Sequence, residues 1–407
     1  MRLGEALTNR ADLQRRIRPT EWERRSRSCS SGSSSRGISP AIPTWRSATR
    51  PPGGNLVTGI SRVRRATRVI VVVLALGLSV PSESAAGEPA EGTRLTVAAS
   101  GDFLIHGPVS RRALAYGHGR RYEFRPMLRA IRPVISRADL ALCHLETPLT
   151  YGRPRGYPSF RAPAALGSAI RATGWDACST ASNHTLDAGQ PGVNTTLDVL
   201  DRFRVRHDGS YRTRAGPRRP TILKARGVKV AFLAYTALTN GQALPHPWTL
   251  KLARASRIVR DARRARRAGA DAVIVNLHWG AEYRRAPTRA QRSLAAAITR
   301  SRAVTAVVGQ HVHVVQPIRW INGKPVIFGE GNLLSNQTAA CCPPGSQDGL
   351  IALLHLRVGG SGVRAVRVRY LPTYVRHPDF TVVRARGRSR GRTIRAAGRS
   401  SRVVPIR

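Results

Sequence analysis

The stretch DACSTASNHTLDAGQPGVNTTLDVLDRF, residues 176–203, joins a short apolar run to a longer amphipathic one. The first part, 176–182, predicts a buried strand, and 193–203 predicts a helix. Asn183 and His184 follow the predicted strand directly. A strand followed by a helix is the repeating unit of a layered α/β sheet, in which ligands bind beyond the carboxyl ends of the strands. The stretch therefore predicts both a fold class and the place of a functional site.

The same alternation of short apolar and longer amphipathic runs continues from Thr93 onward. It predicts one large α/β domain over residues 93–380, and two β-like runs near its end predict a hairpin that completes the sheet layers. Predicted strands cover 95–100, 139–146, 176–182, 229–235, 272–277, 304–308 and 325–328, predicted helices cover 124–136, 163–173, 193–203, 250–268 and 289–301, and the hairpin runs are 350–358 and 363–370.

Both ends of the chain differ in composition from this domain. Residues 1–61 are rich in Arg, Ser and Pro, so we interpret them as a disordered extension, with a true start near Leu56 or Val57 as our hypothesis. In 62–86 a basic run precedes the apolar segment 69–80 and small residues follow, which is typical of a secretory signal peptide, with an uncleaved N-terminal anchor as the alternative. We expect an exported protein, extracellular or associated with the cell envelope, and a disordered basic tail over 384–407.

The formal charge of +46 is carried mostly by arginine, since only four of the 68 basic residues are lysines. Such a charge ordinarily suggests nucleic acid, but no helix-turn-helix, zinc-finger or base-stacking pattern accompanies it. The basic face of the amphipathic segment 250–268 is typical of a solvated helix. We therefore predict no nucleic-acid partner.

Five cysteines, Cys29, Cys143, Cys178, Cys341 and Cys342, are present. An oxidising exterior permits disulfides, but their connectivity cannot be read from the sequence. A structural disulfide or a buried thiol is favoured for each over a zinc site, because the adjacent pair lacks a CxxC partner.

Acidic, amide and imidazole side chains recur at five predicted strand ends. Each signal alone is weak, but their recurrence indicates a single site where the strand ends meet. Carboxylate, amide and neutral imidazole donors together suit Zn, Mn or Fe, and a pair of such divalent ions is suited to phosphoester hydrolysis. The residues are Asp102, Glu146, Asn183 with His184, His278, and His311 with His313.

Six motifs follow one another along the chain: GDFL (101–104), HLETP (144–148), ASNHTLDAG (181–189), LHWGAEY (277–283), GQHVHVVQP (309–317) and GEGNL (329–333). In this order, over about residues 94–375, they resemble the CapA family of bacterial capsule and poly-γ-glutamate synthesis proteins, which is similar in fold to calcineurin-like metallophosphatases. The resemblance implies a layered sheet sandwich of that type with helices flanking the sheets.

The resemblance also implies roles for the site residues. Asp102 and His313 would hold one divalent ion, Asn183, His278 and His311 would hold the other, and Glu146 would bridge the two. His184 would contact the substrate phosphate or protonate the leaving group. Asp187 would fix the His184 ring through a hydrogen bond, with a helix N-terminal charge as the equal alternative.

Three residues, His144, Gln310 and Val312, depart from the family pattern. They leave open whether the rim of the site, and hence the substrate preference, is the usual one for the family. His106, four residues after Asp102, is a candidate to replace the histidine that many metallophosphatases carry near the first Asp, at a longer spacing than is usual there.

Within the motif at 277–283, Glu282 is expected either to bind substrate or, slightly favoured, to pair with Arg284 or Arg285.

Three functions are consistent with these residues. The first is an exported protein of capsule or poly-γ-glutamate biosynthesis with a two-metal hydrolytic site, which acts on an anionic polymer or phosphoester beside membrane-bound capsule synthesis subunits. The second is a non-catalytic envelope factor that binds anionic polymer or capsule-assembly partners. The third is a secreted metal-dependent phosphodiesterase or nucleotidase. Stoichiometric transition metal would favour an enzyme over the binding factor.

Overall fold

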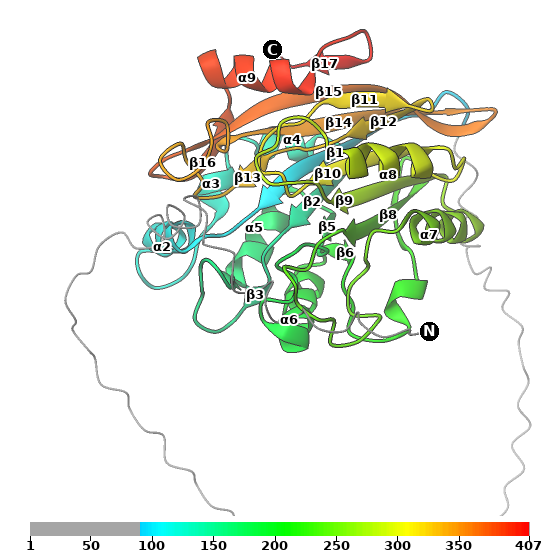
Figure 1. Ribbon diagram of the computed structural model, residues 1–407. Coiled ribbons are helices and arrows are strands. Elements are labelled where there is room, and N and C mark those ends of the chain that lie inside the picture. The colour runs from blue at the N-terminus through cyan, green and yellow to red at the C-terminus, as the bar shows by residue number, and fades with distance from the viewer. Residues whose placement is uncertain (1–89, 407) are drawn as a thin grey trace, which may run out of the picture. The chain divides into compact units, whose positions relative to one another are not determined.

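Two β-sheets stack face to face in the computed structural model, which describes residues 90–406 (Figure 1). The first sheet has nine strands in the order β16-β15-β14-β1-β2-β5-β6, with β13 beside β1 and β17 beside β15. Its strands β1, β2, β5 and β6 run parallel, whereas β14 and β15 form an antiparallel hairpin. The bounds are β1 Arg94–Phe103, β2 Leu140–Leu145, β5 Ala177–Ser179, β6 Arg206–Asp208, β13 Asn332–Leu334, β14 Asp348–Gly359, β15 Gly362–Arg376, β16 Thr381–Arg384 and β17 Val403–Pro405.

The second sheet has six strands in the order β11-β12-β10-β9-β8-β7. Strands β8, β9, β10 and β12 run parallel, and β7 and β11 pair antiparallel at the two edges. The bounds are β7 Thr221–Ala225, β8 Val228–Thr236, β9 Ala272–His278, β10 Ala306–Gln310, β11 Ile318–Ile321 and β12 Lys324–Ile327, and a separate short pair is formed by β3 Leu149–Thr150 and β4 Ala162–Pro163.

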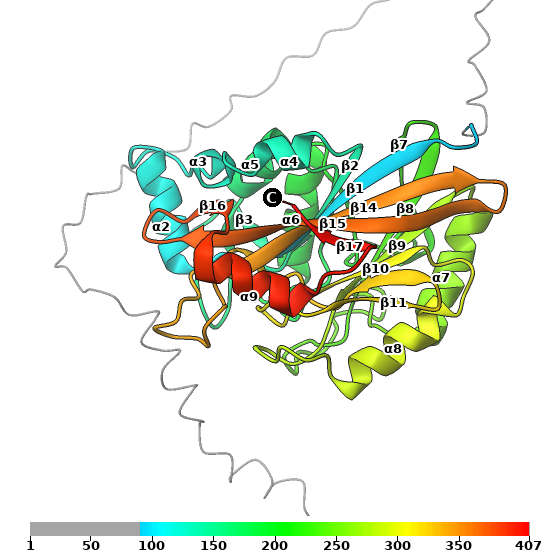
Figure 2. The same ribbon diagram turned by 90° about the horizontal axis from the view of Figure 1, so that it is seen from above.

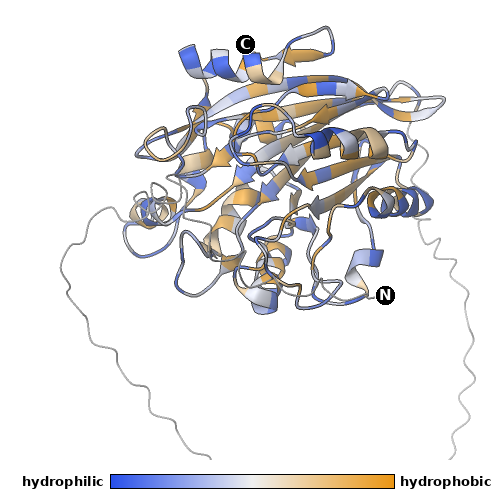
Figure 3. Ribbon diagram, viewed as in Figure 1, coloured by the Kyte–Doolittle hydropathy of each residue, from blue (hydrophilic) through white to orange (hydrophobic). Residues whose placement is uncertain are grey.

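Helices cover the outer faces of both sheets, so the molecule has a helix, sheet, sheet, helix layering. One apolar core lies between the sheets, a second joins the first sheet to α2–α5, and a third joins the second sheet to α7 and α8. Figure 3 shows hydrophobic residues concentrated on the strands and polar residues on the outer side of α7. The helices are α2 Gly107–Tyr116, α3 Arg125–Leu128, α4 Arg132–Ser136, α5 Ala165–Thr173, α6 Gly189–Arg202, α7 Ala255–Arg267, α8 Arg289–Thr299 and α9 Gly387–Ala397, with a 3₁₀ turn at Gly216–Arg218.

The predicted layered α/β sandwich with flanking helices is confirmed. Each of the seven predicted strands overlaps an observed one, and the predicted hairpin is the β14–β15 pair. Strands β2 and β9 are buried along their whole length, which is why they read as mostly apolar runs, interrupted by His144 in β2 and by Asn276 in β9. Helix α8 begins with a capping box in which Thr288 and Gln291 bond each other's backbone N–H groups.

Three predicted helices differ from the structure by four residues or more, one of them being α6, which begins at Gly189 rather than at 193. The single helix expected over 124–136 is two short helices, α3 and α4, because Pro133 lacks an N–H and opens a new helix rather than continuing the first. The helix expected from 250 begins only at Ala255. Residues 250–252 are extended instead, since Ser210 pairs with Leu250 and Thr236 pairs with Leu252.

A buried ion pair near this segment joins the two sheets. Lys251 Nζ lies 3.0 Å from Asp208 Oδ2, and both side chains are buried. Asp208 ends β6 of the first sheet, yet its carboxylate accepts a 2.7 Å hydrogen bond from the backbone N–H of Ala234 in β8 of the second. Lys251 Nζ donates hydrogen bonds to both carboxylate oxygens of Asp208, and such bonds are what make a buried charge pair tolerable. It holds the edge of one sheet to a strand of the other.

The disordered tail expected over 384–407 is a wrong prediction. Helix α9 and strand β17 occupy this region, and Figures 1 and 2 show α9 lying over the β14–β15 hairpin. Ala397 and Val403 are buried in the core between the sheets, and Arg392 Nε lies 2.8 Å from the buried Asp348 carboxylate. A few well-placed apolar residues therefore order a segment whose overall composition is that of a disordered tail.

The predictions for 1–61 and 62–86 lie outside the described residues. Over 90–406, no helix combines the length and apolar character that crossing a membrane requires.

A disulfide joins Cys143 of β2 to Cys178 of β5, which are register neighbours with Cα atoms 4.4 Å apart. Cys341 and Cys342 lie in the loop before β14, with their Sγ atoms 3.0 Å apart.

Candidate metal centre

The side chains predicted to form the site meet where the carboxyl ends of both sheets come together. Asp102 lies at the end of β1, Glu146 follows β2 and Asn183 follows β5, all in the first sheet. The second sheet contributes His278, the last residue of β9, together with His311 and His313 after β10. All six side chains are buried. The six side chains, which are spread over more than two hundred residues from Asp102 to His313, therefore come together as predicted.

One group of possible metal ligands consists of Asp102, Glu146 and His313. Their donor atoms all lie within 4.8 Å of one another. His313 Nδ1 is 3.1 Å from Asp102 Oδ2, and His313 Nε2 is 3.7 Å from Glu146 Oε1. The two imidazole nitrogens thus face two different carboxylates.

A second group consists of Glu146, His278 and His311, again within 4.8 Å. His278 Nε2 lies 3.9 Å from Glu146 Oε1 and 2.8 Å from Asn183 Oδ1. Glu146 belongs to both groups, which is the position predicted for a bridging carboxylate. The cluster can therefore hold a divalent cation, and the division of its residues between two ions stays a prediction.

Glu146 gives the clearest test of whether the residues fit a metal. Both of its carboxylate oxygens are buried without a hydrogen-bond partner, and so is Nδ1 of His311. Burial, opposed by the charge of His313, raises the pKa of Glu146 well above its usual value. Unsatisfied buried polar atoms are rare in proteins, and a cation held between these donors would satisfy them. The donor set fits a divalent metal.

The histidines of the cluster differ in protonation. Burial lowers the pKa of His278 well below its ordinary value and that of His311 to about 3, so both are neutral imidazoles suited to coordination. For His313 burial acts in the same direction, but the carboxylates of Glu146 and Asp102 outweigh it and raise the pKa to about 10. A metal bound at His313 must displace this proton, so its affinity should increase with pH.

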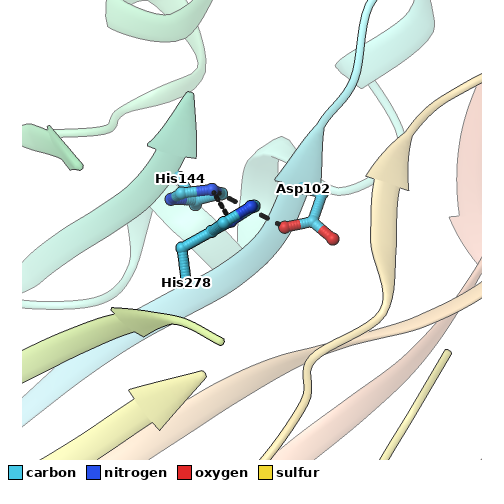
Figure 4. Close-up of side chains that lie close together, drawn as sticks. All are labelled: Asp102, His144 and His278. Carbon is cyan, nitrogen blue, oxygen red and sulfur yellow. Dashed lines mark hydrogen bonds and ion pairs between the residues drawn. The ribbon is translucent and has the colours of Figure 1, made fainter. Parts of the chain in front are cut away.

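His144 was predicted only as a family departure that concerned the rim, and the structure places it inside the cluster. Figure 4 shows it beside His278 and Asp102. His144 Nε2 lies 2.9 Å from His278 Nδ1 and 3.8 Å from Asp102 Oδ1. Burial lowers its pKa to about 4. Because it bonds the ring nitrogen of His278 that faces away from Glu146, it orients a predicted ligand. It enters the cluster through its register pairing with Asp102 across β1 and β2, which the sequence does not reveal.

The HVH segment has an unusual backbone that brings both rings inward. His311 and His313 have positive φ angles of 88° and 54°, which non-glycine residues seldom adopt. Such strain is concentrated at functional sites. Asn332, a residue of the GEGNL motif for which no role was predicted, helps to hold the His313 ring in place. Its Oδ1 lies 3.1 Å from His313 Nδ1.

His184 and Asp187 lie beside the cluster as a hydrogen-bonded pair. Nδ1 of His184 is 2.8 Å from Asp187 Oδ2. The same carboxylate accepts hydrogen bonds from the backbone N–H of Phe160 at 2.7 Å and from Gln242 Nε2 at 3.1 Å. The structure thus places Asp187 against the His184 ring, which is the first of the two arrangements expected for it.

A cavity of about 280 Å³ opens next to these side chains. Its wall includes His184 and His313 from the site and Arg111, which supplies a positive charge. His106 also lines the cavity but belongs to no group of three metal donors within the described residues. The other residues of the wall that bear on function are Tyr157, Phe160, Glu282, Tyr283, Cys341 and Cys342.

Glu282 does not make the favoured ion pair. Among the ion pairs found over residues 90–406, none joins it to Arg284 or Arg285. Its carboxylate instead lies within 4.8 Å of donor nitrogens of His311 and His313.

These features define the protein as a layered α/β sandwich with a metal-competent His, Asp and Glu cluster at the carboxyl ends of its strands. Residues 96–337 match the model of the family described as bacterial capsule synthesis protein PGA_cap, and the chain belongs to this family.

Two relatives carry related names. The capsule biosynthesis protein CapA of Bacillus anthracis is 23% identical over 284 residues, 67% of this chain and 66% of that protein. The PGA biosynthesis protein CapA of Bacillus subtilis is 25% identical over 240 residues, 57% of this chain and 61% of that protein. The chain therefore spans slightly less than two thirds of either relative.

Two solved structures also resemble the fold. The calcineurin-like phosphoesterase YfkN from Bacillus subtilis is 16% identical, with coverage of 75% of this chain and 96% of that chain and a TM-score of 0.40. A putative 5'-nucleotidase from Staphylococcus aureus is 13% identical, with coverage of 75% and 58% and a TM-score of 0.44.

Glu330 is a fully buried carboxyl next to the cluster. Because of it, we expect the free energy of unfolding of the protein to depend on pH. Burial, which outweighs the hydrogen bond from Gln310, raises its pKa from 4.5 to about 8. Between these values the folded state binds one more proton than the unfolded state, so the free energy of unfolding falls as pH rises, by up to about 1.4 kcal/mol per pH unit. We expect Glu330→Gln to flatten this fall between pH 5 and pH 7.5 in urea denaturation with a chelator present. Parallel wild-type and variant curves would contradict the prediction.

Proposed function

We propose that the protein is an exported hydrolase of capsule or poly-γ-glutamate biosynthesis that cleaves a phosphoester at a site for two divalent ions. The observation that carries the proposal is the buried carboxylate of Glu146, which belongs to two groups of metal donors and has no hydrogen-bond partner of its own. Asp102 and His313 would complete one ion site, and Asn183, His278 and His311 would complete the other. Mn, Zn and Fe all suit such a mixed donor set.

Bound ions would supply charge stabilisation and a water of lowered pKa. The chain's own residues perform the remaining tasks. Asp187 accepts a hydrogen bond from Nδ1 of His184 and so fixes the orientation of the ring. Nε2 is then the ring nitrogen that can gain or lose a proton. Because His184 also lines the cavity, Nε2 can donate to a leaving-group oxygen or to a phosphate oxygen. Phe160 packs edge-to-face on the same ring, with centroids 4.7 Å apart, and restricts its rotation.

The substrate in this proposal is an anionic polymer or a phosphoester attached to one, processed beside membrane-bound capsule synthesis subunits. The names of the two relatives and the family description support the pathway. Arg111 at the cavity wall supports an anionic substrate.

A second observation favours the non-catalytic alternative. A surface cavity of about 760 Å³ beside α9 and β16 is lined by five arginines, Arg376, Arg384, Arg386, Arg388 and Arg392. Such a surface would attract an anionic polymer without any metal.

The test begins with elemental analysis of the purified full-length protein. We expect two divalent metal ions per chain and hydrolysis of bis(p-nitrophenyl) phosphate, together with reduced surface polymer when the gene is deleted. A protein without stoichiometric metal would exclude the hydrolase and favour the polymer-binding factor. Hydrolysis with no change in surface polymer would favour a secreted phosphodiesterase or nucleotidase.

A further inference from the structure

The loop between β9 and α8 is held rigidly against the HVH segment. Gly280 has a φ of 103°, and a Cβ there would lie only 2.7 Å from Val312 Cγ1, so the loop backbone touches that side chain. The backbone N–H of Tyr283 donates a 2.7 Å hydrogen bond to the carbonyl of Val312, the residue between the two histidines. Glu282 lies between these two anchors. Its position relative to His311 and His313 is therefore set by the fold.

The Glu282 carboxylate differs from the other acids of the cluster in its access. Asp102 and Glu146 are completely buried, whereas Glu282 is only partly buried and lines the cavity. Its oxygen nevertheless lies within 4.8 Å of donor nitrogens of both His311 and His313. It thus approaches the candidate metal centre from the side on which a substrate would enter.

The Glu282 carboxylate is close enough to either histidine to share the ion that this histidine would hold. Ligand distances of about 2.0–2.2 Å place two donors of a tetrahedral ion roughly 3.4 Å apart, so a shift of about 1 Å from a separation of at most 4.8 Å would suffice. A partly exposed glutamate side chain that lines a cavity can make that shift by rotating about its side-chain bonds. Nδ1 of His311, moreover, is buried without a hydrogen-bond partner.

The charge balance of the site also favours Glu282 as a metal ligand. Two divalent ions would bring four positive charges, and Asp102 and Glu146 would offset two of them. The remaining positive charge would draw a further anion, and Glu282 is the acidic side chain of the cavity wall. The same charge would draw an anionic substrate, which would compete with Glu282 for the ion.

We propose that Glu282 is a replaceable metal ligand that binds from the cavity side and yields its place to an oxygen of the anionic substrate. The inference rests on the proposed two-metal site. It identifies Glu282 as a switch between a closed resting site and a substrate-bound one.

The test compares full-length wild type with Glu282→Gln by Mn²⁺ titration against a chelating dye and by the electron paramagnetic resonance signal of bound Mn²⁺. We expect about tenfold or greater weakening of Mn²⁺ binding, since loss of even an indirect metal contact typically costs 10–100-fold. At saturating Mn²⁺ the variant should bind inorganic phosphate more tightly, because the competing carboxylate is gone. Glu91→Gln, which removes an equal charge at the opposite end of β1, is the matched control and should match wild type.

Mn²⁺ affinity of Glu282→Gln within twofold of wild type would overturn the proposal while leaving the two-metal site intact. Weaker Mn²⁺ binding accompanied by weaker phosphate binding would overturn the replaceable role, since a permanent ligand would then explain the data. A wild-type protein that binds no Mn²⁺ would overturn the proposed function and this inference together.

Discussion

Replacing Glu146 by glutamine is expected to abolish stoichiometric metal binding and to lower phosphoester hydrolysis by about 10³-fold or more. Glu146 is the one carboxylate common to the two donor groups that would hold the proposed pair of ions, so its loss affects both positions. Bound metal contributes several kcal/mol of transition-state stabilisation, and each 1.36 kcal/mol corresponds to tenfold in rate. Glutamine has nearly the same volume but lacks the charge. Elemental analysis and initial rates at fixed metal concentration measure the two effects.

Glu330→Gln is the matched control for this experiment. Glu330 is also a fully buried glutamate with a raised pKa, but it belongs to no donor group of the described chain. Its Oε2 accepts a 2.7 Å hydrogen bond from Gln310 instead. The control should retain both ions. If Glu146→Gln also retained two ions, Glu146 would not be the bridging ligand; if both variants lost metal, the cause would be a general disturbance of the core.

Replacing His184 by alanine is expected to lower the catalytic rate by about 10²–10⁴-fold without changing metal content, because a positioned proton donor contributes that much. The effect should be larger for an alkyl phosphoester than for a p-nitrophenyl ester, whose leaving group needs little protonation. Equal losses for both esters would instead assign His184 to contact with the phosphate. A change in metal content would contradict its placement outside the ligand set.

Asp187→Asn provides the companion measurement. Its carboxylate bonds Nδ1 of His184 and the backbone of Phe160, so the substitution should misorient the ring rather than remove it. A smaller loss than in His184→Ala, with the same dependence on the leaving group, is expected. No loss at all would show that the ring is held by its packing on Phe160.

Much of the fold could be predicted because its parallel strands are buried on both faces. Strands such as β2 and β9 therefore read as mostly apolar runs, and a helix such as α7 carries a helical spacing of apolar residues. The positions of Asp102, Glu146 and His278 at strand ends followed from the same pattern. Helix α9 could not be predicted in this way, since only a few of its residues reach the core and its composition resembles that of a disordered tail.

The sequence alone determined the α/β layering and six side chains that meet in one buried cluster, because local apolar periodicity sets where strands end and parallel strands end at a common edge. Only the tertiary structure decided which metal-donor side chains lie close enough together to bind the same ion. His144 enters the cluster through its pairing with Asp102, and Glu282 reaches His311 and His313 because the loop from Gly280 to Tyr283 is fastened to Val312. Such contacts depend on strand order and on the positive φ angles of the HVH segment, and residues far apart in the chain carry no local pattern that encodes them.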